Sequence, residues 1–365
     1  MVCHRFLDRS IRILEETFRG IMHTKELKVF CIAQTRLNQE ATRQWLDHIG
    51  ASETPVPVVR KQDMQCHDCE GRGRHDNLGP YCSTCQGHGT LPNVEPEITD
   101  AGAVCGICAK RCYMSFEPGL NPNISKVRKD WFDYLSNILE SRHGSVTEHA
   151  TWTFAIEGVS RVFTGEMNRH RAGVAISEGS MRYIRFDDIG MWMPKSLEPG
   201  DDSLMPTRKC KTCDGSGKLL MSLDDCPKCL GSGRINLLSP AEFEGNKYQT
   251  QHLIRQTFHD IEEKYRALCE IWDMENLKSF DVKKKLTSLF RRIIPMGTST
   301  GGCWTFNTRA LRHIIALRTD PAAEEEIAHV VGLIGKWIIE SEPALFGDFA
   351  IDDKTGAYVP RWVKV

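Results

Sequence analysis

Length, composition and charge exclude several classes of protein. The chain has 365 residues and a net charge of −1 at pH 7, with 15 cysteines. This length can bury a sizeable core, in one large or two ordinary domains, and a near-neutral charge gives no bulk attraction to nucleic acid or to an anionic membrane. The sequence has no bilayer-spanning apolar run and no apolar signal core at its N-terminus, so we expect a cytoplasmic protein.

The first predicted elements precede a cysteine-rich segment. Residues 1–26 carry apolar residues at helical spacing and predict an N-terminal helical extension. Residues 28–33 predict a buried strand, and residues 39–49 predict a helix that ends at Gly50. We therefore expect the folded core to begin near residue 27.

Further elements follow from apolar periodicity. Residues 131–139 have helical spacing, and residues 151–156 alternate between apolar and polar or small residues, as in a half-buried strand. Residues 253–271 and 327–338 predict two long helices whose apolar stripes pack in the core or in a subunit interface. Helices and strands do not alternate regularly, and no dinucleotide-binding glycine fingerprint is present, which disfavours a Rossmann fold.

Eight cysteines form four Cys-x-x-Cys-x-Gly-x-Gly motifs, grouped as two pairs with twelve residues between the inner cysteines of each pair. Two such turns can present four thiolates to one ion, the tetrahedral set that zinc prefers, and a closed four-thiolate site is structural. Without a signal peptide, this pattern favours metal over disulfides. The predicted zinc ligands are Cys66, Cys69, Cys82 and Cys85 in the first pair, and Cys210, Cys213, Cys226 and Cys229 in the second.

These motifs resemble the cysteine-rich zinc domain of J-domain co-chaperones. Each pair can close its own site, or the two pairs can exchange partners, and we favour local closure because it needs no long-range loop. The lysines and arginines around the motifs are scattered and few aromatic residues accompany them. We therefore expect a structural or partner-docking role for the two segments, with nucleic-acid or polypeptide binding as the alternative.

A central stretch concentrates arginine, histidine and glutamate. It contains HGSVTEHATWTF from His143, EGVSR from Glu157, NRHR from Asn168 and EGSMRY from Glu178. Arginine presents a planar fork of donors to phosphates and carbonyl edges, and several arginines close together repel one another unless an anion lies among them. The stretch therefore predicts a site for a phosphorylated, planar ligand.

The same four blocks, in order, resemble the central part of the flavin-dependent thymidylate synthases. The similarity continues upstream in 110–116 and downstream in 291–295, 304–309 and 317–318. Four motifs in series are far more specific than one. The resemblance implies an α+β fold, a twisted sheet flanked by helices, and a homotetramer. The cysteine motifs add two small inserted zinc-binding hairpin modules to this fold.

The resemblance also implies an activity. The chain is expected to transfer a one-carbon unit from methylene-tetrahydrofolate to C5 of dUMP, giving dTMP, with FAD as the flavin and NADPH as the reductant. Structural zinc at two sites is expected from the cysteine motifs. The implied organisation is a core of 27–55, 97–194 and 238–350, with zinc insertions at 56–96 and 195–237 and a C-terminal tail at 351–365.

Site residues carry over by position. Arg318 would face the pyrimidine ring, and Ser180 would donate a hydrogen bond to the substrate. The implied flavin-binding residues are His149, Thr151, Arg169, His170, Arg171, Glu178, Asn307, Arg309 and His313. The implied substrate-binding residues are Glu166, Arg169, Glu178, Gly179, Ser180, Arg182, Arg291 and Arg318.

Three departures from the family pattern bear on the substrate. Glu166 replaces a usual glutamine, His313 replaces a common asparagine, and the loop between Arg171 and Ser180 is one residue longer. A carboxylate accepts hydrogen bonds without donating them and pairs well with the exocyclic amine of cytosine. The alternatives are thus the same machinery acting on dCMP or making a 5-hydroxymethyl pyrimidine nucleotide, and a zinc-module binding protein on a degenerate synthase core.

Overall fold

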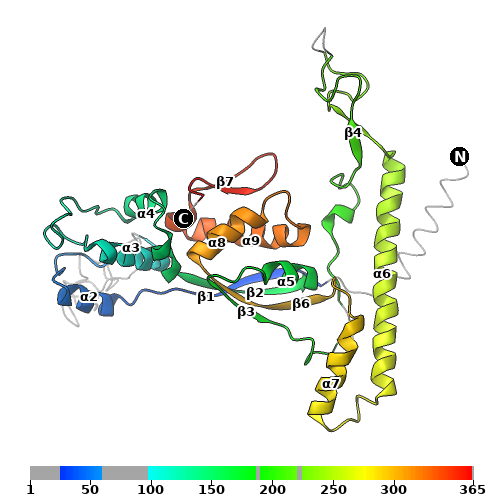
Figure 1. Ribbon diagram of the computed structural model, residues 1–365, viewed down its shortest axis with the longest axis horizontal. Helices are drawn as coiled ribbons and strands as arrows, with labels where there is room; N and C mark the ends of the chain where they lie inside the picture. Colours follow the sequence, from blue (N-terminus) through cyan, green and yellow to red (C-terminus); the bar gives the residue numbers. More distant parts are fainter. Residues whose placement is uncertain (1–24, 60–97, 186–189, 220–223, 364–365) are drawn as a thin grey trace, which may run out of the picture. The chain divides into compact units, whose positions relative to one another are not determined.

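The computed structural model of the protein describes residues 25–59, 98–185, 190–219 and 224–363 (Figure 1). Most of the predicted N-terminal helix, residues 1–26, and the first cysteine pair, Cys66 to Cys85, lie outside the described residues. Among the described residues, no helix combines the length and the apolar character needed to cross a membrane.

The chain divides into two compact units. The first comprises residues 1–27, 157–164 and 178–301, and the second comprises residues 28–156, 165–177 and 302–365. Each has buried clusters of its own: Phe258, Tyr265 and Phe290 belong to one in the first unit, and Tyr134 and Ile138 belong to one in the second.

The main sheet has four strands in the order β1-β2-β6-β3. Their bounds are Lys28–Gln34 for β1, Thr151–Ser160 for β2, Val174–Glu178 for β3 and Ser299–Asn307 for β6. Along β2, Trp152, Phe154 and Ile156 are buried, whereas the residues between them are half-buried. The strand predicted at 151–156 is therefore confirmed. A strand also forms at 28–34, but the prediction that it is buried is wrong, because Phe30 and Ile32 are 53% and 57% exposed. A mixed helix-and-sheet fold is observed.

Two helices of the second unit, α8 (Thr308–Arg318) and α9 (Glu325–Ser341), cover one face of this sheet (Figure 1). The Phe154 ring packs edge-on against Trp337 at 5.7 Å between centroids. The apolar stripe predicted in α9 is buried in this core, as shown by Ile327, Val330, Val331, Ile334 and Ile338. The arrangement fixes α8, and with it the residues that α8 presents.

The second unit has further helical elements. They are α2 (Gln39–His48), α3 (Asp100–Tyr113), α4 (Trp131–Glu140), η1 (Gly144–His149) and α10 (Pro343–Phe346). Among them, α3 packs against both α4 and η1. Asp130 caps α4 by accepting a hydrogen bond from Asp133 N (2.7 Å). In α3, Gly106 leaves room for Trp131, whose ring would lie 2.9 Å from an added Cβ. The helices predicted at 39–49 and 131–139 are confirmed.

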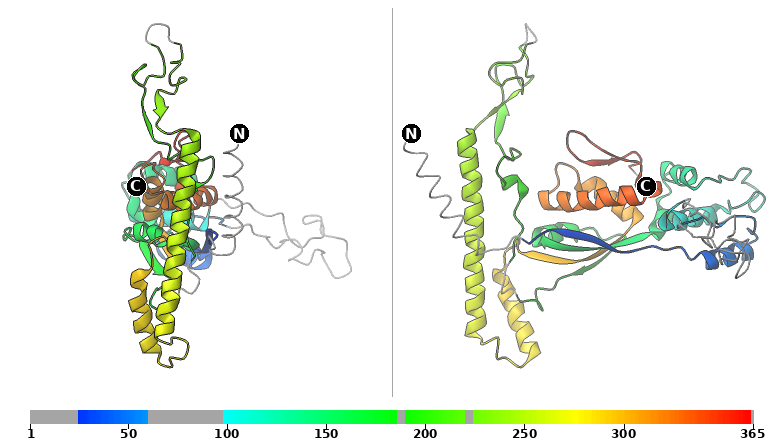
Figure 2. Two further views of the ribbon diagram at one scale, coloured as in Figure 1. Left: turned by 90° about the vertical axis from the view of Figure 1, so that its right-hand side faces the viewer. Right: turned by 180° about the vertical axis from the view of Figure 1, so that it is seen from behind.

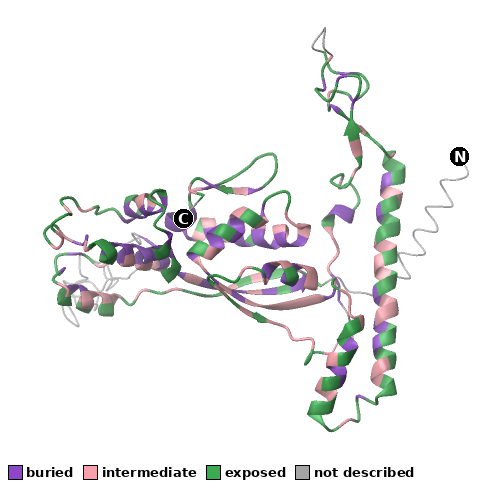
Figure 3. Cartoon of the chain, viewed as in Figure 1, coloured by how far each residue is buried: buried purple, intermediate pink, exposed green. Residues whose placement is uncertain are grey.

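The first unit is dominated by the 32-residue helix α6 (Pro240–Ile271), which runs beside α7 (Phe280–Phe290) (Figure 2). Tyr265 and Phe290 join the two helices edge-on at 5.9 Å. Ser239 and Glu242 form a capping box at the start of α6. Most of α6 is exposed or half-buried, as Figure 3 shows.

Short elements complete the described residues. They are α5 (Arg161–Met167), η2 (Lys195–Leu197), η3 (Arg291–Ile293) and two hairpins, β4 (Thr207–Lys209) with β5 (Arg234–Asn236) and β7 (Phe349–Ile351) with β8 (Tyr358–Pro360). Both hairpins are antiparallel. The β4–β5 hairpin carries the second cysteine pair.

Candidate functional site

Arg318, the last residue of α8, is held by three hydrogen bonds to the Glu166–His170 segment. Its Nε donates to His170 Nε2 (2.8 Å), its Nη1 donates to Glu166 Oε2 (2.9 Å) and its Nη2 donates to the Glu166 carbonyl oxygen (3.3 Å). The Arg318 side chain is 15% exposed. Its guanidinium group therefore has a fixed orientation while it stays accessible at one edge.

Glu166 also binds a second cation. Its Oε1 accepts a hydrogen bond from Arg169 Nη1 at 3.2 Å, and the Arg169 side chain is 71% exposed. A carboxylate between two guanidinium groups offsets their mutual repulsion. Glu166 thus allows Arg169 and Arg318 to lie in one small region of the second unit.

His170 accepts the Arg318 hydrogen bond as a neutral ring. Burial, and after it the charges of Arg318 and His313, lower the pKa of His170 from 6.5 to about 4. At neutral pH its Nε2 therefore carries a lone pair that faces Arg318. The His313 ring lies edge-on to His170 at 6.2 Å. Two of the three departures from the family pattern, Glu166 and His313, consequently belong to one group of side chains.

Asn307 connects the start of α8 to the loop that contains Gly173. Its Oδ1 accepts a hydrogen bond from Ala310 N (2.8 Å) and caps α8. Its backbone N–H donates to the Gly173 carbonyl oxygen (2.9 Å). Gly173 has a φ of +71°, and an added Cβ would lie 2.5 Å from the Asn307 amide, so a glycine is needed there. Asn307 therefore has a structural role in the helix that carries Arg318.

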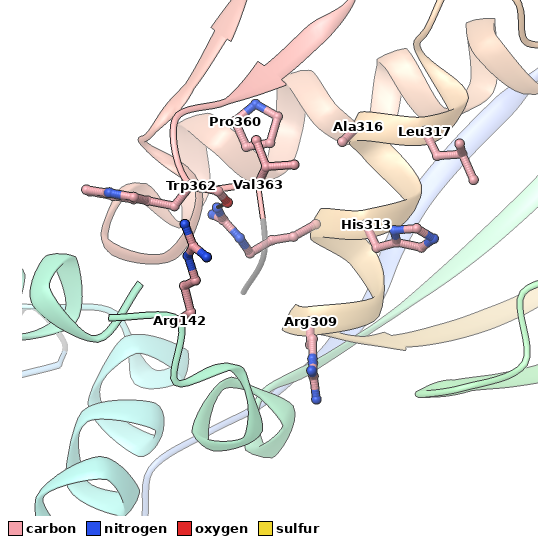
Figure 4. Close-up of a pocket in the computed structure, with 9 residues that line it drawn as sticks. Arg142, Arg309, His313, Ala316, Leu317, Pro360, Trp362 and Val363 are labelled. Atoms are coloured by element: carbon pink, nitrogen blue, oxygen red, sulfur yellow. Dashed lines mark hydrogen bonds between the residues drawn. The ribbon is translucent and has the colours of Figure 1, made fainter. Parts of the chain in front are cut away.

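A cavity of about 540 Å³ lies beside α8 in the second unit. Figure 4 shows its lining, with His313, Ala316 and Leu317 along α8 and Pro360, Trp362 and Val363 from the C-terminal segment. Arg142, Arg309 and Arg312 also line it. Two residues assigned to the flavin from sequence, Arg309 and His313, thus line one cavity. Arg309 also pairs with Glu148 at 2.8 Å, and the guanidinium groups of the lining fit a negatively charged cofactor.

Three other residues that were predicted to bind the flavin also lie in the second unit. Thr151 donates its backbone N–H to Thr35 Oγ1 (2.8 Å), which ties β2 to the end of β1. His149 and Arg171 are exposed. Their proposed contacts with a flavin stay predictions.

In the first unit, Glu178 and Gly179 lie beside an arginine that we did not select from sequence. Arg161 forms an ion pair with Glu178 and donates to the Gly179 carbonyl oxygen (2.8 Å). Both side chains of the pair are 17% exposed. Arg161 ends the EGVSR block, so its place in a motif was the signal that could have identified it.

The remaining predicted substrate residues of the first unit lie near a turn or on the surface. The Ser180 hydroxyl oxygen accepts a hydrogen bond from the Arg182 backbone N–H (3.4 Å). This contact is consistent with a turn residue and gives no sign of a serine nucleophile. Arg182 and Arg291 are exposed, as cations that bind a phosphate from solution would be.

The four cysteines of the second pair of motifs form one buried cluster. The sulfur atoms of Cys210, Cys213, Cys226 and Cys229 all lie within 4.8 Å of one another. Cys210 Sγ lies 3.9 Å from Cys226 Sγ, and Cys213 Sγ lies 3.6 Å from Cys229 Sγ. Four sulfurs around zinc at about 2.3 Å would be separated by about 3.8 Å, whereas a disulfide needs about 2.05 Å. The four thiols fit a zinc ion.

Gly217 and Gly233 make this packing possible. Both have positive φ, and a Cβ on either would lie within 2.3 Å of a backbone oxygen of the opposite turn. Glycine is therefore needed at both positions, because a side chain there would meet the backbone of the opposite turn. The pair is brought together locally, within residues 207–236.

Comparison with known proteins gives the family. Residues 96–344 match Thy1, described as thymidylate synthase complementing protein. The chain belongs to the Thy1 family. Among relatives, it is 27% identical over 249 residues to a flavin-dependent thymidylate synthase of Mycobacteroides abscessus, covering 68% of this chain and 80% of that protein. A flavin-dependent thymidylate synthase of Mycobacterium sp. (strain JLS) is 27% identical over 265 residues, covering 72% and 86%.

A solved structure, the UMP/dUMP methylase PolB from Streptomyces cacaoi bound with 5-Br dUMP, is 19% identical and covers 70% of this Thy1-family chain and 91% of its own, with a TM-score of 0.44. A likeness at that level carries no argument about chemistry. Membership of the family confirms the fold family and the enzyme class predicted from the four motifs. The zinc modules, the oligomeric state and the individual site residues stay predictions.

Proposed function

We propose that this chain transfers a one-carbon unit from methylene-tetrahydrofolate to C5 of dUMP, giving dTMP, with FAD as cofactor and NADPH as reductant. The observation that carries the proposal is the Thy1 match over residues 96–344. It is supported by the contact between the Arg169-His170-Arg171 segment and Arg318, which the motifs alone did not reveal.

Arg318 has the chemistry needed at the pyrimidine ring. As C5 becomes nucleophilic, electron density grows on the ring carbonyls, and a fixed cation stabilises that change. A guanidinium group has five N–H donors, and Arg318 uses three of them on His170 and Glu166. Two remain for a carbonyl oxygen, and the preset orientation avoids reorganisation during the reaction.

The flavin, when bound, would take hydride from the nicotinamide and mediate transfer of the carbon. Toward it, the second unit offers the cavity lined by Arg309 and His313, together with the exposed guanidinium groups of Arg169 and Arg171. His149, Thr151, His170, Asn307 and Glu178 complete the proposed set. Guanidinium groups suit a pyrophosphate because they bind its oxygens bidentately.

Toward the nucleotide, the first unit offers Ser180 as a donor and Arg182 and Arg291 as phosphate ligands. Glu178 and Gly179, fixed by Arg161, would position the loop that carries Ser180. Glu166, Arg169 and Arg318 are proposed as substrate ligands as well. Each residue would bind or orient substrate, and none needs to form a covalent bond with it.

The cysteine segments are proposed as structural zinc modules, at 56–96 and 195–237, inserted into a core of 27–55, 97–194 and 238–350 with a tail at 351–365. The sulfur separations in the second module support a closed site. A closed four-thiolate site stabilises a small fold that has little apolar area of its own. We also propose a cytoplasmic homotetramer.

The test is turnover by purified protein supplied with FAD, NADPH, methylene-tetrahydrofolate and dUMP, with dTMP measured by chromatography. Formation of dTMP that depends on both FAD and methylene-tetrahydrofolate is expected. Arg318→Ala serves as the inactive control. Failure of the folded protein to bind FAD at all would contradict the proposal.

A further inference from the structure

Glu166 and Arg318 form an ion pair whose two side chains are both partly exposed. The Glu166 carboxylate, 30% exposed, lies 2.9 Å from the Arg318 guanidinium, which is 15% exposed. The carbonyl oxygen of Glu166 binds the same guanidinium. An acceptor-only group and a donor-only group therefore stand side by side, both with an accessible edge.

Such a pair complements a ring edge on which an N–H donor neighbours an acceptor. Uracil offers N3–H beside a carbonyl, and cytosine offers its exocyclic amine beside N3. A glutamine at position 166 would behave differently. With its amide oxygen on Arg318, its NH2 group would face the ring as a donor, which suits a uracil carbonyl and opposes the cytosine amine.

We propose that Glu166 is a specificity-determining residue that admits a 4-aminopyrimidine nucleotide alongside the uracil nucleotide. The inference rests on the proposed function, in which Arg318 faces the pyrimidine ring. Arg169 supports it, since a second guanidinium group on the other carboxylate oxygen keeps Glu166 oriented as an acceptor. The substrate class is a pyrimidine deoxynucleoside monophosphate that carries either an oxo or an amino group at C4.

The experiment measures dissociation constants of dUMP and dCMP by calorimetry on FAD-loaded wild type, Glu166→Gln and Glu166→Asp. Wild type is expected to bind both nucleotides at one site, with dCMP competing against dUMP. Glu166→Gln is expected to weaken dCMP relative to dUMP by about tenfold, the effect of one hydrogen bond. Glu166→Asp keeps the carboxylate and should keep the wild-type ratio even where both affinities fall.

Glu275→Gln is the matched control, because Glu275 also pairs with an arginine, Arg185, at 2.6 Å but is 81% exposed and has no proposed role. Its ratio should equal that of wild type. A Glu166→Gln ratio within about twofold of wild type, or no dCMP binding by wild type, overturns the inference. If Glu166→Gln does not fold, an altered ratio in Glu166→Asp overturns it and an unchanged ratio supports it. Failure of wild type to bind either nucleotide would instead count against the proposed function.

Discussion

Helix α8 carries two arginines, six residues apart, whose ion pairs with carboxylates differ in burial and in the number of hydrogen bonds. Arg312 and Asp348 are 4% and 2% exposed and form two parallel bonds of 2.6 and 2.8 Å. Arg312 also donates to the carbonyl oxygens of Leu345 and Trp362. Arg318 and Glu166 are 15% and 30% exposed, and one hydrogen bond joins their side chains, from Arg318 Nη1 to Glu166 Oε2.

Burial separates the two roles. A pair that is almost fully buried uses its hydrogen-bonding groups on protein partners, and losing one partner leaves a buried charge without compensation. Arg312 therefore ties α8 to the C-terminal segment. A partly exposed pair contributes less to stability than a buried pair and keeps donors for a substrate. The same side-chain chemistry thus gives a structural tie at one position and a proposed recognition site two turns later.

Asp348→Asn should destabilise the fold strongly. The shape is kept, but the Arg312 guanidinium loses its buried counter-charge, so the free energy of unfolding should fall by about 3–5 kcal/mol. Urea denaturation measures it. Glu275→Gln, at an exposed pair, should change that free energy by less than about 1 kcal/mol. Equal effects at the two sites would show that burial does not distinguish them.

The four-cysteine hairpin should fold and bind metal independently of the flavin site. Cys226→Ser should remove one zinc per chain and destabilise residues 207–236, because three thiolates no longer close the site. FAD binding should persist, since none of the proposed flavin ligands lies in that hairpin. Zinc by metal analysis and FAD by absorbance report on the same sample. The paired change Cys66→Ser and Cys69→Ser tests the first segment in the same way. Loss of FAD from a zinc-depleted but folded variant would contradict this separation.

The smallest expected effect concerns pH. The pKa of His170 lies near 4, below its ordinary 6.5, mainly through burial and then through Arg318. A lowered histidine pKa stabilises the folded state above pH 6.5, and this contribution is lost as the pH falls toward 4. Arg318→Ala should raise the pKa of His170. Ring proton shifts in NMR spectra measure it, and titration of the wild-type ring near 6.5 would contradict the Arg318–His170 contact.

Local patterns were sufficient for much of the fold. The alternation at 151–156 and the stripe at 327–338 predicted β2 and the buried face of α9, because both elements bury one side against the sheet. The start of α6 was missed. Its apolar stripe begins at residue 253, whereas the helix begins at Pro240, after the capping box at Ser239 and Glu242.

The residues of the candidate site could be predicted from the sequence, but the contacts between them could not. The motifs selected Glu166, His170 and Arg318, yet nothing in the sequence indicates that they meet, since Arg318 lies 148 residues from His170 and 152 from Glu166. Arg312 was not selected because an arginine on a helix is ordinarily a solvated surface charge. Its partner lies 36 residues away, beyond any helical spacing.

Arg318 is proposed to bind the nucleotide, whereas Arg312 ties α8 to the C-terminal segment. One paired measurement tests it: the dUMP dissociation constant and the free energy of unfolding, for Arg318→Lys and Arg312→Lys. Lysine keeps the charge and loses the planar fork. Arg318→Lys should weaken dUMP binding by about tenfold to a hundredfold, with the free energy of unfolding changed by less than about 1 kcal/mol. Arg312→Lys should lower that free energy by about 3 kcal/mol and leave the affinity of the folded protein for dUMP unchanged. Affinity for dUMP that is unaffected in Arg318→Lys, or that falls equally in both variants, would contradict the account.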